Sequence, residues 1–246
     1  ADPWLKPRDF GRYPTALPLA NMTRIQDLAA VAVCVSAVVV AAIGMWGPVT
    51  GGGMTMKTWF GWHPVLMTLA FPCFMALGRY SYVADALPDR QSRRLTHRAL
   101  MILGVLSALG GYLCIFMAHY PKRHLFGYNF TKHEWATPAR VAHGIIGYGV
   151  LLLAVVQAAM GIAKMEFLSQ GVKTFAFHGV LGKAILTLGA VNIFIAVYFW
   201  AWSTTFKVLL VVLVAFALPV FGVLLPAAKS STEEAPLLPE PAVVKQ

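Results

Sequence analysis

Six long apolar runs, separated by short polar loops, constrain the fold of this chain more than any other feature. Hydrophobic residues make up 58% of the 246 residues and charged residues only 12%, which is far from the composition of soluble domains. About 20 apolar residues cross a bilayer, so the chain has room for about six spans and no large soluble domain. We therefore predict an all-α integral membrane protein.

The runs predict six transmembrane helices in a domain covering residues 26–226. A polar, basic tail (1–25) precedes it, and a tail rich in Pro and Glu (227–246) follows it and is expected to be disordered. The three cysteines lie in predicted spans without C-x-x-C or C-x-x-C-H motifs, which argues against a disulfide framework, a zinc ribbon and covalently attached haem. The predicted spans cover about 26–46, 61–83, 97–118, 140–163, 175–200 and, after a link at 203–207, up to 225.

The basic residues predict the orientation in the membrane. The formal charge of +10 lies in loops, without the interleaved aromatics of a nucleic-acid surface, so we expect no nucleic-acid partner. One side of the bundle collects both tails and the loops after spans two and four, with 13 of the 20 Lys and Arg, against six on the other side. We predict a multi-pass protein whose termini both lie in the cytosol.

Four histidines stand near the starts of four spans, in two matched pairs of motifs. A-H-G-I-I-G recurs as F-H-G-V-L-G, around His143 and His178, while H-P-V-L-M and H-R-A-L-M begin at His63 and His97. The predicted topology puts His63 and His143 near the outer surface. It puts His97 and His178 near the cytosolic surface, so each surface has one histidine from each kind of helix.

Two facing imidazoles can ligate a haem iron axially, which would offset the cost of polar groups in a span. Gly147 and Gly182 each follow a histidine by four residues, on the same helical face, where a flat macrocycle could approach the backbone. Met67 and Met101 take the equivalent places in the other two helices and could pack against it through sulfur. The two irons would be roughly 20 Å apart, which suits electron transfer across the bilayer.

Other interpretations of the histidines are less economical. Single histidines near helix ends can reach the interface, and small residues four apart can serve helix packing. Four histidines in paired motifs with consistent sidedness favour haem over that explanation. A zinc site would need all four at one depth, and the topology separates them.

The chain from about 26 to 226 resembles the cytochrome b561 family, most closely its short six-helix animal-type members. F-G-W-H-P-V-L-M (60–67) is similar to the second-helix motif of that family, and His97, His143 and His178 fall at its other three haem-ligand positions. The resemblance implies two haem b groups in a central four-helix bundle of spans two to five, flanked by spans one and six.

The resemblance also implies a transmembrane, ascorbate-dependent oxidoreductase. Electrons would pass from cytosolic ascorbate to monodehydroascorbate or a ferric chelate on the other side, often in a homodimer. The bilayer would be an endomembrane, of the ER, vacuole or lysosome, or the plasma membrane.

Candidate substrate residues lie at both surfaces. Arginine forks suit a small anion such as ascorbate, and four arginines flank the predicted inner haem, although they could serve topology alone: Arg79, Arg93, Arg94 and Arg98. The outer loop is longer than the family pattern and breaks the positive-inside trend. Its candidates for an outer ligand are His119, Lys122, Arg123, His124, His133 and Arg140, among which the substrate histidine is not fixed.

Two other functions compete with this interpretation. One is a haem-b membrane anchor that exchanges electrons with quinone for a partner enzyme. The other is a metal or proton transporter with a histidine relay, which is disfavoured because spans two to five lack Asp and Glu apart from Glu166 at an end.

Overall fold

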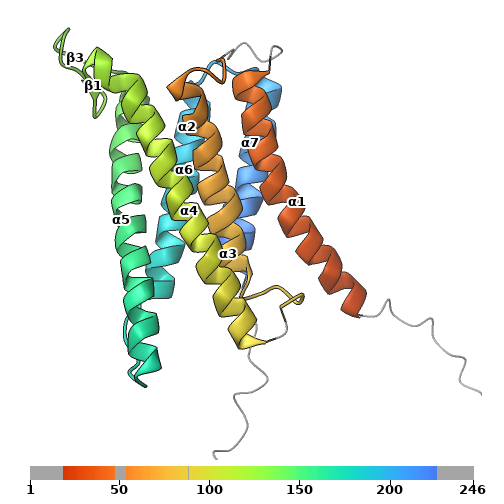
Figure 1. Cartoon of the computed structure of the whole chain (residues 1–246). Coiled ribbons are helices and arrows are strands. Elements are labelled where there is room, and N and C mark those ends of the chain that lie inside the picture. The colour runs from red at the N-terminus through yellow and green to blue at the C-terminus, as the bar shows by residue number, and fades with distance from the viewer. Residues whose placement is uncertain (1–18, 48–53, 88, 226–246) are drawn as a thin grey trace, which may run out of the picture.

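The computed structural model describes residues 19–47, 54–87 and 89–225. Within these ranges, six helices are long and apolar enough to cross a membrane, and successive helices run in opposite directions (Figure 1). The predicted all-α, six-span class is therefore confirmed. The helices are α1 (Leu19–Trp46); a second helix made of α2 (Trp59–Thr68), a π-helical turn (Leu69–Met75) and α3 (Ala76–Tyr80); α4 (Arg90–His119); α5 (Pro138–Ser169); α6 (His178–Phe199); and a last helix made of α7 (Thr204–Ala215) and a π-helical turn (Phe216–Leu224).

Several helices extend beyond the predicted spans. α1 begins at Leu19, inside the segment predicted as a tail. α4 begins at Arg90, capped by the Asp89 carboxylate, which accepts a hydrogen bond from the Ser92 amide. His97 therefore lies about two turns inside α4 rather than at its start. The rest of the two predicted tails lies outside the described residues.

The core lies between α1, the second helix, α6 and the last helix. Small side chains on α1, including Cys34, Ala37 and Ala41, are fully buried and allow close helix approach. Leu106 on α4 and Leu152 on α5 are well exposed, as expected for side chains that face lipid.

Two proline-containing stretches depart from regular α-helix. Pro72 lies inside the π-helical turn of the second helix, and Pro219 inside that of the last helix. A π-helical turn accommodates an extra residue and often marks a functional site. In the second helix it falls between the His63 region and the α3–α4 connection.

The connection between α4 and α5 folds into a small antiparallel sheet, which the sequence analysis did not anticipate. Its strands are β1 (His124–Leu125), β2 (Tyr128–Asn129) and β3 (Glu134–Trp135), in the order β1-β2-β3. The β1–β2 turn is closed by Gly127 at φ +79°, a conformation that glycine adopts without strain. We call this sheet, residues 124–135, the cap, and the end of the bundle that carries it the cap end.

The start of α1 and the end of the last helix both lie at the opposite end of the bundle (Figure 1). The α3–α4 and α5–α6 connections lie there too, so we call it the termini end. This arrangement agrees with the predicted topology. Which end faces the cytosol stays a prediction.

Candidate functional site

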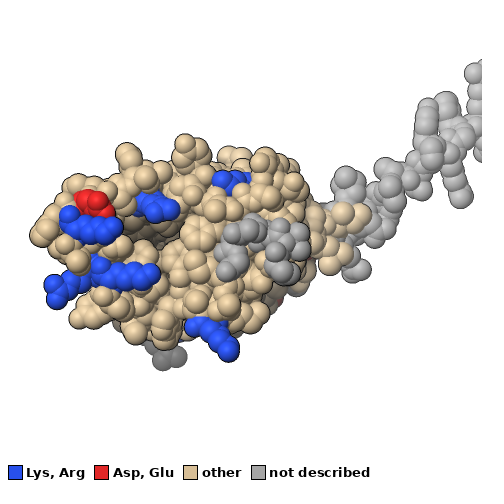
Figure 2. Space-filling view, turned by 90° about the horizontal axis from the view of Figure 1, so that it is seen from above, with Lys and Arg blue, Asp and Glu red and all other residues tan. Residues whose placement is uncertain are grey.

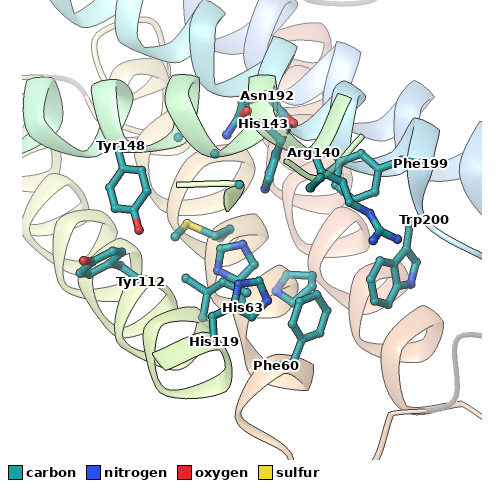
Figure 3. A pocket seen from close by; sticks show the side chains of 18 of the residues that line it. Phe60, His63, Tyr112, His119, Arg140, His143, Tyr148, Asn192, Phe199 and Trp200 are labelled. Carbon is teal, nitrogen blue, oxygen red and sulfur yellow. Dashed lines mark hydrogen bonds between the residues drawn. The ribbon is translucent and has the colours of Figure 1, made fainter. Parts of the chain in front are cut away.

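At the cap end, His63 on α2 and His143 on α5 face each other across a cavity of about 540 Å³ (Figure 3). Their ring centroids are 6.3 Å apart and their planes are 85° to each other. Two imidazoles that bind one metal from opposite sides, each with a nitrogen about 2 Å from it, hold their ring centroids roughly 6 Å apart. The spacing of the two rings therefore fits a shared axial metal such as a haem iron.

Both rings are oriented for that task. His63 Nδ1 lies 2.9 Å from the Gly111 carbonyl oxygen, and His143 Nδ1 lies 3.1 Å from the Asn192 carbonyl oxygen. Because a carbonyl oxygen only accepts, each Nδ1 must carry the proton, which leaves the Nε2 lone pair free for a metal. Metal-binding histidines are held by such bonds in general.

The cavity walls are apolar with a few polar atoms, as in cofactor sites. Met67 and Gly147 line the cavity, each one turn after its histidine. Three buried polar atoms of lining residues have no hydrogen-bond partner among the described residues: Trp200 Nε1, Trp202 Nε1 and Asn192 Oδ1. Such atoms carry a desolvation cost that a bound polar group would relieve.

Three of the outer-loop candidates line this cavity. His119 is half-buried and stacks on Phe60, with centroids 6.1 Å apart and planes at 20°, while Phe60 stacks on Trp200 at 5.0 Å and 13°. His124 lies beside His119, with centroids 6.3 Å apart. The Arg140 guanidinium lies 5.7 Å from the Phe199 ring centroid, in a cation–π contact (Figure 3).

The other outer candidates lie around the cavity rather than in it. Lys122, Arg123 and His133 are exposed and do not line the cavity, although Figure 2 shows Lys and Arg side chains around the hollow at this end. Lys132 pairs with Glu134 at 3.8 Å, with both side chains well exposed.

Sequence reasoning missed the aromatic walls of the cavity. Phe60 precedes His63 by three residues, a spacing that puts both on one helical face and could have identified it. Tyr112 on α4 and Tyr148 on α5 contact each other edge to face in the cavity wall, with centroids 5.6 Å apart (Figure 3). No local motif marks those two residues or Trp200.

At the termini end, His97 and His178 lie within electrostatic range of each other. His97 Nδ1 lies 2.8 Å from the Gly78 carbonyl oxygen, so its Nε2 is also free. His178 lies against α5, because a Cβ on Gly161 would be 3.4 Å from its Cε1 atom. The two predicted inner ligands, on α4 and α6, therefore lie near enough to interact electrostatically, and their pairing on one metal stays a prediction.

Met67 and Met101 make equivalent contacts next to His63 and His97. A Cβ on Gly111 would be 3.2 Å from Met67 Cε, and a Cβ on Gly78 would be 3.2 Å from Met101 Cε. Each methionine thus packs on the glycine whose carbonyl holds the histidine one turn before it. Gly147 and Gly182, the glycines that the sequence predicted, lie against side-chain amides instead. A Cβ on Gly147 would be 3.1 Å from the Asn192 amide nitrogen, and a Cβ on Gly182 would be 3.0 Å from the Gln157 amide nitrogen.

The predicted inner arginines have different surroundings. Arg93 donates from Nε to the Leu87 carbonyl oxygen at 2.6 Å and from Nη1 to the Tyr82 carbonyl oxygen at 3.1 Å, so it fastens the α3–α4 connection to α4. Arg79 donates from Nη2 to the Leu225 carbonyl oxygen at 3.0 Å, while its buried Nη1 has no partner among the described residues. Arg98 is exposed on α4.

Tyr82 joins this end, although the sequence analysis did not select it. Its ring centroid is 5.0 Å from that of His97. Burial raises the pKa of the Tyr82 phenol despite the opposing effect of Arg94, Arg79 and Arg90. The phenol therefore stays protonated at neutral pH, as a hydrogen-bond donor among cationic groups.

Among the described residues, no group of three or more His, Cys, Asp or Glu could hold a metal ion. A metal at either histidine pair would therefore need further ligands from outside the protein, as haem iron has in its porphyrin.

Comparison with known families agrees with this geometry. The family model of eukaryotic cytochrome b561 matches residues 62–204, a range that contains all four histidines. No curated protein matches the chain. The match covers more than half of the chain, so this protein belongs to the cytochrome b561 family, whose members bind haem b and transfer electrons across membranes.

Proposed function

We propose that the chain carries electrons from cytosolic ascorbate, through two b haems, to monodehydroascorbate or a ferric chelate on the other side of the membrane. The observation that carries the proposal is the facing pair of His63 and His143, each with Nδ1 on a carbonyl and Nε2 free. At the other end His97 likewise has its Nδ1 on a carbonyl, that of Gly78, and lies within electrostatic range of His178.

The protein supplies positions and polarity at the cap end. His63 and His143 would hold the outer haem, and the apolar walls would keep water from it. Bound haem supplies one-electron chemistry, because its iron alternates between the ferric and ferrous states. His119, Phe60 and Arg140 line the same cavity, so they would contact the acceptor or the anionic edge of the haem.

The termini end suits an anionic donor. Arg79, Arg94 and Tyr82 gather where His97 approaches the surface, and the guanidiniums stay charged at any working pH. They would attract the ascorbate monoanion, while the Tyr82 phenol could donate a hydrogen bond to one of its oxygens.

Visible spectroscopy and vesicle assays test the proposal. The purified protein should show a reduced-minus-oxidised spectrum of haem b with two hexacoordinate centres, and ascorbate should reduce both. In vesicles, ascorbate on the termini side should reduce a ferric chelate on the cap side only when the protein is present. A haem that ignores ascorbate but is reduced by a quinol would overturn the proposal in favour of the quinone-linked anchor.

A further inference from the structure

The four histidines differ in one respect, the partner of the Nδ1 atom. His63, His97 and His143 each donate from Nδ1 to a main-chain carbonyl on another helix. His178 Nδ1 is buried and has no hydrogen-bond partner in the described part of the chain. A buried N–H without an acceptor is costly, and metal-ligating histidines are in general fixed through that atom.

The sequences of α5 and α6 share a longer pattern than the H-G-x-x-G motif. In α5, Gln157 lies fourteen residues after His143, and in α6, Asn192 lies fourteen residues after His178. The two helices are antiparallel neighbours, so each amide reaches the histidine turn of the other helix. The Asn192 side chain lies by Gly147, and that of Gln157 by Gly182.

The two amides make different bonds at these equivalent places. Asn192 holds His143 through its main-chain carbonyl. Gln157 instead donates from Nε2 to the His178 carbonyl oxygen at 2.6 Å, and its Oε1 atom is buried without a partner. Gly161, one turn further along α5, lies against the His178 ring. Gln157 therefore lies on the face of α5 against which this ring packs.

An unpartnered acceptor on α5 and an unpartnered donor on α6 thus belong to two residues that are already joined by one hydrogen bond. Rotation about the last side-chain bond of glutamine or histidine crosses only low barriers, because these torsions are broad. We infer that Gln157 is the positioning residue for His178: its Oε1 accepts the Nδ1–H hydrogen bond when the ring holds the inner haem, while Nε2 stays on the His178 carbonyl. This inference rests on the proposed role of His178 as a haem ligand.

The bond has a measurable electronic consequence. An acceptor on Nδ1–H makes the imidazole a more basic ligand, which favours the ferric state and lowers the reduction potential. Removal of the acceptor should therefore raise the potential of the inner haem and leave the outer haem unchanged. A merely structural role for Gln157 would not shift one potential selectively.

The test is a potentiometric titration of the purified full-length holoprotein, with haem content measured beside it. Gln157→Leu should make reduction of the inner haem more favourable by about tenfold in its equilibrium constant, which is ~59 mV for one electron. Gln157→Glu keeps an acceptor oxygen and should restore a potential at or below that of the wild type. Gln170→Leu makes the same chemical change at an exposed position at the end of α5 and should leave both potentials unchanged.

Each outcome decides for or against the inference. Loss of the inner haem from Gln157→Leu with retention in Gln157→Glu would support it, since both variants lose the Nε2 donor to the His178 carbonyl and only Glu keeps an acceptor oxygen. Equal potentials in wild type and Gln157→Leu would overturn it. An inner-haem shift in Thr174→Val alone would also overturn it, because Thr174, four residues before His178, has a buried hydroxyl without a partner among the described residues. If His178→Ala retained both haems, the ligand assignment itself would be wrong, and the two failures are thus distinguishable.

Discussion

The tight contact between Gly111 and Met67 gives a prediction that separates packing from helix propensity. A Cβ on Gly111 would lie 3.2 Å from Met67 Cε and 3.3 Å from Leu66 Cβ, whereas a Cβ on the preceding Gly110 would meet only Leu66 Cδ1, at 3.7 Å. Carbon atoms prefer separations of about 3.5–4.0 Å. Met67 Cε is the end of a flexible side chain and can move, but Leu66 Cβ is fixed to the α2 backbone, so Gly111→Ala strains the α2–α4 contact and Gly110→Ala does not.

The size of the effect follows from two opposing contributions. Replacing glycine by alanine inside a helix stabilises it by about 0.5–1 kcal/mol, and this gain is common to both variants. Overpacking costs about 1–3 kcal/mol, and only Gly111→Ala incurs it. The difference in melting temperature between the two variants thus isolates the strain. Each kcal/mol of strain should lower the melting temperature of Gly111→Ala by about 2–4 °C relative to that of Gly110→Ala.

The strain should also reach the outer haem, because the Gly111 carbonyl oxygen holds His63 Nδ1. The measurement is thermal loss of haem absorbance in one detergent, together with the spectra and potentials of both haems. Gly110→Ala should melt at or slightly above the wild-type temperature with unchanged spectra. Equal melting of the two variants, or a Gly111→Ala change confined to the inner haem, would refute this account of how α4 positions His63.

Three further predictions test other parts of the structure. His143→Ala should remove the outer haem absorbance and leave the inner largely intact; simultaneous loss of both haems from folded protein would count against the pairing. Arg94→Ala should raise the ascorbate concentration for half-reduction in stopped-flow mixing, more at low salt, with dithionite reduction unchanged; an unchanged ascorbate dependence in Arg94→Ala combined with Arg79→Ala would eliminate this site. Asp89 accepts hydrogen bonds from Ser92 that hold the pKa of its carboxyl below the usual value. The carboxylate therefore stabilises the start of α4 fully above the pKa of the unfolded state, and this stabilisation is lost as pH falls through the lower pKa of the folded state. Asp89→Ala should speed hydrogen exchange of the first α4 turn at neutral pH, and an exchange rate equal to wild type at pH 7 would contradict the cap.

The sequence was sufficient for those features that depend on local pattern. Apolar run length defined the six helices, since the spans agree with the described helices to within a few residues at most ends. The paired motifs identified His63 and His143, which do meet in space. The alternating direction of the predicted spans placed His97 and His178 at the opposite end from His63 and His143, and the fold agrees, whereas the side of the membrane predicted from loop charge stays a prediction.

Features that depend on contacts between distant segments could not be read from the sequence. The role of Arg93 is an example, because its two acceptors are carbonyls of the α3–α4 connection whose positions depend on the conformation of that loop. The cap is another, since it forms from two-residue strands too short for a recognisable alternation. Trp200 reaches the cavity only because α6 ends beside α2, where it stacks on Phe60.

The π-helical turn in the second helix explains how His63 and His97 can be held in the same way by glycines at different spacings. Gly111 lies fourteen residues after His97, but Gly78 lies fifteen after His63, and each glycine carbonyl holds the histidine of the other helix. The turn Leu69–Met75 lies between His63 and Gly78, so its extra residue compensates for the difference in spacing.

Deleting Phe74, a half-buried residue of that turn, tests this step. In a regular α-helix, removal of one residue turns everything beyond it by about 100° and shifts it by about 1.5 Å. Removal from the π-helical turn differs, because the turn can relax to regular α-helix with fourteen residues between His63 and the glycine, as between His97 and Gly111. If the extra residue only compensates for the longer spacing, the Gly78 carbonyl should stay on His97 and both haem spectra should remain. Because the outer site reports folding within the same molecule, loss or spectral change of the inner haem alone would show that the extra residue does more than compensate for the spacing.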